Sequence, residues 1–424
     1  MPDPELSLAE VGPGVRVLTL AQPQRQTVDL SVFVRTGSQH ERARENGISH
    51  VVEHMAFKGT ATRSCQQINL DAELLGAEVN AHTDKDHTAF HISGLARDAG
   101  RFVQMLAEIV QHGSFPEAEL ERERQVILHE LTEDDEDPVT TAFKLFDRAC
   151  WGPHPYAQPV IGHRAGIARV TRADLQAYVQ RQYTACNVIV AVAGGVQAEA
   201  IEAEAAAAYA GLPRGQPNAV PAPAFVGGLT QRRLSCSTQT HSVIGFALPS
   251  LAGEPECGIV AAALFGEGMS SPLLDEIRER RGLAYHLACS ADITELAGQF
   301  VIEASTAPEQ AGAYLAEVRR LLLAQADRID PVALARARNQ LAVRSLRQGE
   351  RAGRRLETAA LDLYARGELR SPAQTLERLL AVSAEDLRSL FAAMAAARPA
   401  IALAGKLPAG LADRAGALFA PAVL

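Results

Sequence analysis

Hydrophobic and polar residues alternate along several short stretches of the chain. This period of two predicts strands at Val15–Leu20 and Val28–Arg35. It also predicts an antiparallel pair, Val79–Thr83 and Thr88–Leu95, around a tight connection at residues 84–86. A further apolar strand covers Asn187–Ala193.

Helical spacing of apolar residues follows or separates these strands. It predicts helices near residues 46–58, 66–75, 98–112, 116–134, 138–150 and 171–182. Strands grouped with helices on one face predict an α+β fold, in which a mainly antiparallel sheet is covered by helices.

The second half of the chain repeats the first at a spacing of 211 to 212 residues. Thr171–Leu175 corresponds to Ser383–Leu387, and the strand that ends at Gly194 corresponds to one that ends at Gly405. This repetition predicts two duplicated α/β-sandwich domains, at residues 1–210 and 227–424. Residues 211–226, rich in proline and glycine, are the expected linker.

Composition narrows the classes of function. A chain of 424 residues with 47% hydrophobic residues can build two cores, and its net charge of −9 argues against nucleic acid as a partner. The six cysteines are scattered and form no CxxC pair, which favours a reducing compartment over a disulfide framework.

No apolar stretch approaches the length of a membrane span, and residues 1–20 lack the pattern of a secretory signal. We therefore expect no membrane association and a cytoplasmic location, or a periplasmic one if a leader has been removed.

The strongest chemical signal is His50-Val-Val-Glu53-His54, inside a stretch that is predicted to be helical. At 3.6 residues per turn the two imidazoles stack on one face, so both can reach one metal ion with Glu53 beside it. This order of residues is the inverted form of the zinc-protease motif.

A catalytic zinc takes three protein ligands, so a third ligand is expected on another element. The charged, periodic stretch 117–133 reads as a helix, and its Glu123 and Glu130 stand seven residues apart on one stripe. Either glutamate suits the chemistry.

These segments together resemble the pitrilysin-type (M16) zinc peptidases, similar to processing-peptidase subunits. Glu130 stands 76 residues after His54, where that family carries its third zinc ligand, and Glu123 occupies the place of a further family glutamate. The likeness extends to residues 76–83, 155–162, 183–194, 268–271 and 280–285. One departure is His129, where bacterial relatives usually carry an acid.

The resemblance implies a zinc endopeptidase with one Zn²⁺ per chain, held by His50, His54 and Glu130. Glu53 is then the general base, and Glu123 supports the catalytic site.

The resemblance also implies residues that bind the peptide substrate. The strand that contains Asn80 and Ala81 is similar to the family's edge strand, which receives an extended peptide. Arg281 and Tyr285 match a pair that steadies the substrate carbonyl oxygen. Glu267 departs from the glycine that is usual ahead of that pair.

Family members enclose a chamber with four such domains, so this two-domain chain is expected to pair with a second M16-type subunit, as a homodimer or a heterodimer. Two other functions stay open: a non-catalytic assembly or binding subunit, and a small-molecule metallohydrolase.

The repeat places apolar residues where the first half has ligands. His50, Glu53 and His54 correspond to Ala261, Leu264 and Phe265, and Glu130 corresponds to Arg344. We expect the second domain to keep the helix but to hold no metal.

Overall fold

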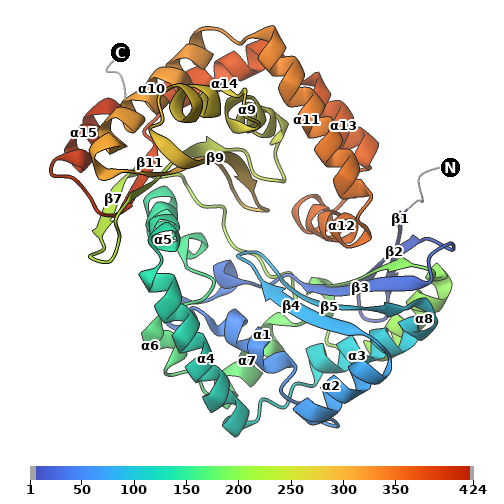
Figure 1. Cartoon of the computed structure of the whole chain (residues 1–424). Coiled ribbons are helices and arrows are strands. Elements are labelled where there is room, and N and C mark those ends of the chain that lie inside the picture. Colours follow the sequence, from blue (N-terminus) through green and yellow to red (C-terminus); the bar gives the residue numbers. More distant parts are fainter. Residues whose placement is uncertain (1–5, 421–424) are drawn as a thin grey trace. The chain divides into compact units, whose positions relative to one another are not determined.

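The first of two sheets has six strands in the order β1-β2-β6-β3-β5-β4 (Figure 1). The computed structural model describes residues 6–420. All neighbouring strands of this sheet are antiparallel except the parallel pair β2 and β6. The strands are β1 (Leu6–Val11), β2 (Val15–Ala21), β3 (Thr27–Val34), β4 (Glu78–Thr83), β5 (Thr88–Leu95) and β6 (Val188–Gly194).

Most helices of the first half lie along one face of this sheet (Figure 1). Their apolar sides meet the buried strand residues in one core, which includes Val32, Val52, Phe90 and Phe102. The helices of this half are α1 (Ile48–Ala56), α2 (Cys65–Leu74), α3 (Ala99–Gln111), α4 (Glu117–Glu136), α5 (Pro138–Trp151), α6 (Arg164–Ile167), α7 (Arg172–Gln182) and α8 (Ala198–Ala208).

The second sheet has five strands in the order β7-β11-β8-β10-β9, which repeats the order of β2 to β4 in the first sheet. Its strands are β7 (Gly228–Arg233), β8 (Thr240–Leu248), β9 (Ala284–Ile293), β10 (Gly298–Thr306) and β11 (Ala400–Gly405). Its helices are α9 (Glu256–Gly266), α10 (Ala311–Asp327), α11 (Pro331–Gly349), α12 (Ala352–Arg366), α13 (Pro372–Ala381), α14 (Ala384–Ala396) and α15 (Leu411–Leu418), with a π-helix at Leu274–Arg280.

The chain forms two compact units that are interleaved in sequence. One unit contains residues 1–131, 158–220 and 348–364, and the other contains 132–157, 221–347 and 365–424. Helix α5 therefore packs in the second unit, where Phe146 shares a core with Val243 and Ala402. Most of α12 belongs to the first unit, on the sheet face opposite α1 (Figure 1).

The helices and strands predicted in the first half are confirmed, with ends that differ by a few residues. Strand β1 and helices α6 and α8 were not predicted, since their short or alanine-rich sequences carry little periodicity. The boundaries proposed for two consecutive domains stay a prediction.

Two features considered from composition, disulfides and membrane-spanning helices, can be examined in residues 6–420. None of the six cysteines forms a disulfide there. No helix in this range combines the length and the apolar character needed to cross a bilayer.

Candidate metal centre

Helix α1 presents two different faces. Val51, Val52 and Met55 are buried in the core of the first unit, whereas His50, Glu53 and His54 are only partly buried. The spacing of four between the histidines therefore places both imidazoles on the side that leaves the core.

The N-terminus of α1 is fixed by a buried carboxylate. Glu41 accepts hydrogen bonds from the backbone N–H of Gly47 at 2.7 Å and of Ser49 at 2.8 Å, and from the Asn46 amide at 2.9 Å. Gly47 has a φ of +97°, a left-handed conformation that favours glycine. The first turn of the helix is thereby held in one position.

Helix α4 supplies the facing side chains. Leu120, Ile127 and Leu131 are buried on one stripe, and Glu123 and Glu130 belong to the same stripe. The guanidinium of Arg124 donates to the carbonyl oxygens of Ile167 and Val170, which anchors α4 to the end of α6. Glu130 is thus brought to α1 by packing, not by sequence proximity.

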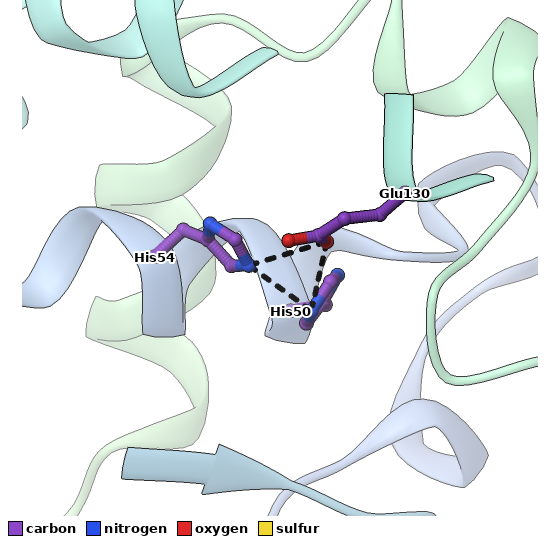
Figure 2. Close-up of side chains that lie close together, drawn as sticks. All are labelled: His50, His54 and Glu130. Atoms are coloured by element: carbon purple, nitrogen blue, oxygen red, sulfur yellow. Dashed lines mark hydrogen bonds and ion pairs between the residues drawn. The ribbon is translucent and has the colours of Figure 1, made fainter. Parts of the chain in front are cut away.

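Three potential ligands meet between α1 and α4, as Figure 2 shows. The Nε2 atoms of His50 and His54 lie 3.2 Å apart. One carboxylate oxygen of Glu130 is 3.9 Å from the His50 nitrogen and 3.6 Å from the His54 nitrogen. Two ligand atoms at about 2.0–2.1 Å from a tetrahedral zinc lie about 3.3 Å apart, so this set fits one zinc ion.

His54 is oriented from its other nitrogen. Its Nδ1 lies 3.1 Å from the Glu123 carboxylate, which also accepts from Lys58 Nζ at 2.7 Å. Burial acts to raise the pKa of Glu123, but the hydrogen bonds from Lys58 and His54 lower it overall, so the group is ionised at neutral pH. Glu123 therefore contacts the candidate ligand His54 and is not itself one of the three candidate ligands.

The imidazole of His50 is prepared to bind a cation. Burial, together with the neighbouring His54, lowers the pKa of His50 to about 4, so it is neutral at pH 7. Its Nε2 is the nitrogen that lies near His54 and Glu130, whereas its Nδ1 is buried with no hydrogen-bond partner among residues 6–420. A neutral imidazole is the form that binds zinc, so the residues present fit the ion.

Glu53 lies on the same helix between the two histidines. Burial raises the pKa of Glu53 above its ordinary value, although the nearby Thr83, His54 and His82 act in the opposite direction. A carboxylate with a raised pKa is suited to take up and release a proton near neutral pH.

Strand β4 is the edge strand of the first sheet. The backbone N–H of Ala81 donates to the side-chain oxygen of its own neighbour Asn80 at 2.8 Å. Beside this strand, Glu78 and Asn80 line a cavity of about 530 Å³ together with charged residues that include Arg25 and Asp29. Asn80 and Ala81 therefore lie where an added strand and its side chains would meet the sheet.

Arg281 and Tyr285 belong to the second compact unit. The Arg281 guanidinium lies 2.9 Å from Glu276 and 3.4 Å from the buried Glu317. Tyr285 is 83% exposed at the start of β9, with Arg278 over its ring. Tyr285 is accessible to a ligand, whereas Arg281 would have to exchange its carboxylate partners.

The repeated helix in the second unit is apolar at the corresponding places. Ala261, Leu264 and Phe265 of α9 are fully buried. Arg344 of α11 pairs with Glu267 at 3.0 Å. His129, the departure noted in α4, is exposed.

Two residues of the centre were not predicted from the sequence, Lys58 and the capping Glu41. Lys58 follows His54 by four residues, just beyond the end of α1, and this spacing is the signal that could have identified it. The contacts of Glu41 depend on a loop conformation that periodicity does not encode.

Comparison with known proteins gives a consistent result. The family model described as insulinase (peptidase family M16) matches residues 16–164, and the one described as peptidase M16 inactive domain matches residues 169–341. An uncharacterized zinc protease of Mycobacterium tuberculosis is 32% identical over 391 residues, which cover 89% of this chain and 88% of that protein.

Two further comparisons concern a mitochondrial protein and a solved structure. Bovine cytochrome b-c1 complex subunit 1 is 35% identical over 194 residues, 46% of this chain and 40% of that protein. The crystal structure of a protease from Helicobacter pylori has a TM-score of 0.87 at 20% identity and covers 95% of this chain and 99% of its own, which is a likeness of fold.

Proposed function

The chain belongs to peptidase family M16, and we propose that it is a zinc-dependent endopeptidase that cleaves peptides or unfolded segments. One observation carries this proposal: His50 and His54 from α1 and Glu130 from α4 converge with spacings that suit one zinc ion. Zinc bound there would supply Lewis-acid polarisation of a water molecule and of the scissile carbonyl group.

The side chains of this chain would carry the remaining steps. Glu53 takes the proton of the attacking water and later passes it to the leaving amine, and its raised pKa suits both transfers. Glu123 and Lys58 keep the His54 ring in one orientation.

Substrate is proposed to add to the sheet as an extra strand beside β4. The peptide would replace the Asn80 oxygen as the acceptor for the Ala81 N–H, and alternate peptide side chains would enter the cavity beside Glu78. Exchange of the Ala81 amide hydrogen should slow when peptide binds to a Glu53→Gln variant, and unchanged exchange would contradict this placement.

The general base is tested by Glu53→Gln. We expect the substitution to lower kcat by about 10²-fold or more while bound zinc stays at the wild-type level. Glu73→Gln, an exposed glutamate on α2, is the matched control and should leave both quantities unchanged. Retained cleavage by the Glu53→Gln variant would remove Glu53 as the base.

We further propose that a second M16-type subunit pairs with this chain to form a clamshell chamber, and that its Arg281 and Tyr285 act on the zinc site of the first. This can be tested by mixing two inactive variants, Glu53→Gln and Arg281→Ala. In a homodimer, random pairing should restore about a quarter of the wild-type activity. No recovery, with mixed dimers demonstrated by mass, would contradict action across subunits.

A non-catalytic assembly or binding subunit is the second candidate. It is favoured by the likeness to bovine cytochrome b-c1 complex subunit 1. Mass-spectrometric mapping of a peptide library separates the two functions, since only the peptidase gives cleavage products that disappear with a chelator.

A further inference from the structure

Three histidines gather on β4, on β5 and on the connection between them: His82, His91 and His87. His82 pairs across the sheet with Ala89, so its diagonal neighbours are His87 and His91. Because successive side chains of a strand point to opposite faces, these three share one face, whereas Ala81 and Phe90 pack in the helix-covered core. The small side chain of Ala89 leaves room for the His82 ring between the other two.

The rings of His82 and His87 face each other, and the Nδ1 atom of each ring makes a hydrogen bond. His87 Nδ1 donates to the Asp86 carboxylate at 2.7 Å, and His82 Nδ1 shares a hydrogen bond with His91 Nε2 at 2.9 Å. His91 is in turn bonded to Ser31 Oγ at 2.7 Å. Metal-binding histidines almost always have their second nitrogen engaged in this way.

The remaining nitrogens meet at a distance that suits a shared ion. His82 Nε2 and His87 Nε2 lie 3.2 Å apart, the same separation as the Nε2 atoms of His50 and His54. Two nitrogen ligands of one tetrahedral zinc are expected about 3.3 Å apart. A carboxylate oxygen of Asp84 completes a set in which all three ligand atoms lie within 4.8 Å of one another.

The connection that carries Asp84 is held in one conformation. Ser38 N–H donates to the Asp84 carbonyl at 3.2 Å, and Gln39 N–H donates to the Lys85 carbonyl at 3.0 Å. A Cβ at Gly37 would lie 2.1 Å from the Asp84 carbonyl oxygen, so only glycine allows this close approach. The backbone of Asp84 is therefore fixed beside the two histidines.

Acidic side chains surround the two facing rings. The Asp86 carboxylate lies 2.7 Å from His87 Nδ1, and a carboxylate oxygen of Asp84 lies within 4.8 Å of the two ligand nitrogens. Glu357 of α12 also interacts electrostatically with the three histidines. These negative charges favour a cation between His82 and His87.

We propose that His82, Asp84 and His87 bind a second zinc ion, separate from the one assigned to His50, His54 and Glu130. With three protein ligands the ion keeps one position for a solvent molecule. Because His82 stands on β4, and Asp84 and His87 stand on the connection that leads into β5, the ion joins the ends of the two strands. Its role is to fix the edge strand.

The test uses a chain from which the first centre has been removed, His50→Ala/His54→Ala, titrated with zinc against a chelating chromophore. We expect this chain to retain one zinc per molecule, and zinc to raise its Tm and slow amide exchange in residues 78–95. Adding Asp84→Asn, an exposed substitution compatible with folding, should weaken zinc binding by about tenfold or more. Adding His82→Asn should abolish it.

His163→Asn is the control, since it removes an exposed histidine at the start of α6. The proposal is overturned if the His50→Ala/His54→Ala chain binds no stoichiometric zinc, or if binding survives unchanged in the His82→Asn chain. In the first case the two histidines share a hydrogen bond and hold no metal, and in the second case the zinc binds at other residues. Because the first centre is absent from every variant, neither result affects the proposed peptidase activity.

Discussion

Replacing Glu123 by glutamine tests whether a carboxylate outside the three ligands sets the affinity of the centre. Glu123 is 9% exposed, and its two oxygens contact His54 Nδ1 at 3.1 Å and Lys58 Nζ at 2.7 Å. The glutamine keeps the size of the side chain but loses its charge. Its amide can accept from one of these two donors, and then it turns an N–H toward the other.

The expected loss follows from this arrangement. Removing an outer partner of a metal-bound histidine typically weakens metal binding by about 10- to 100-fold, or about 1.4–2.7 kcal/mol. We expect the upper part of this range, because an unpaired Lys58 cation would also lie next to the centre. Zinc affinity should fall while the fold is kept.

Zinc competition with a chelating chromophore measures the effect directly. Glu119→Gln is the matched control, because Glu119 lies on the same helix and its partner is the exposed Arg122. Lys58→Met separates the contribution of the ammonium group from that of the His54 contact. Thermal unfolding of the zinc-free proteins reports any defect in folding. If Glu123→Gln binds zinc within about twofold of the control, the orienting role of Glu123 is refuted.

Three further outcomes are expected. Glu41→Gln should lower the free energy of unfolding by about 1–3 kcal/mol in denaturant titrations, because it weakens three buried hydrogen bonds at the start of α1. Equal stability of this variant and the control Glu45→Gln would contradict this expectation. Gly47→Ala should destabilise the fold by at least about 1 kcal/mol and reduce zinc content, since Gly47 has a φ of +97° and a Cβ there would lie 2.6 Å from Ile167 Cδ1. A variant with the zinc content and Tm of the wild type would refute this prediction. Removing zinc with a chelator should abolish peptide cleavage but leave the helical far-UV circular dichroism signal, because apolar packing holds α1 and α4. Loss of that signal would show that the metal is needed for the fold.

The sequence predicts the elements that hold the centre because each of them carries its own periodicity. In α4 the stripe that contains Leu120, Ile127 and Leu131 places Glu123 and Glu130 on the same side. The four-residue spacing of His50 and His54 needs only a helix to become a pair. Local pattern and metal chemistry found His50 and His54 and left Glu123 and Glu130 as candidates for the third ligand. The family resemblance selected Glu130, the glutamate that the structure brings together with the two histidines.

Features that depend on contacts between distant segments were not predictable in this way. Helices α5 and α12 follow α4 and α11 directly in sequence, yet each packs in the compact unit of the other half. Helix α5 shares a core with β8 and β11, and Tyr364 of α12 donates to the Asn187 carbonyl oxygen. The role of Glu123 was left as a general supporting one, since only the fold shows that His54 is its partner. The histidines at 82, 87 and 91 did offer a signal, because the alternation along β4, their connection and β5 places all three on one face once the strands pair.

The two copies of this helix can be compared to see how much stability the polar face of α1 costs. In the second unit the corresponding helix α9 fills its positions with Ala261, Leu264 and Phe265, all fully buried, which stabilises that core by ordinary apolar burial. In the first unit His50 instead has a pKa near 4 and a buried Nδ1 without a partner among residues 6–420. An unsatisfied buried polar group of this kind costs about 1–3 kcal/mol. The fold tolerates an apolar solution at these positions, so the polar residues of α1 are not required for folding. A bound cation would stabilise this polar face through the Nε2 atoms of His50 and His54 and the Glu130 carboxylate, which lie 3.2–3.9 Å from one another, although His50 Nδ1 is not one of these ligand atoms.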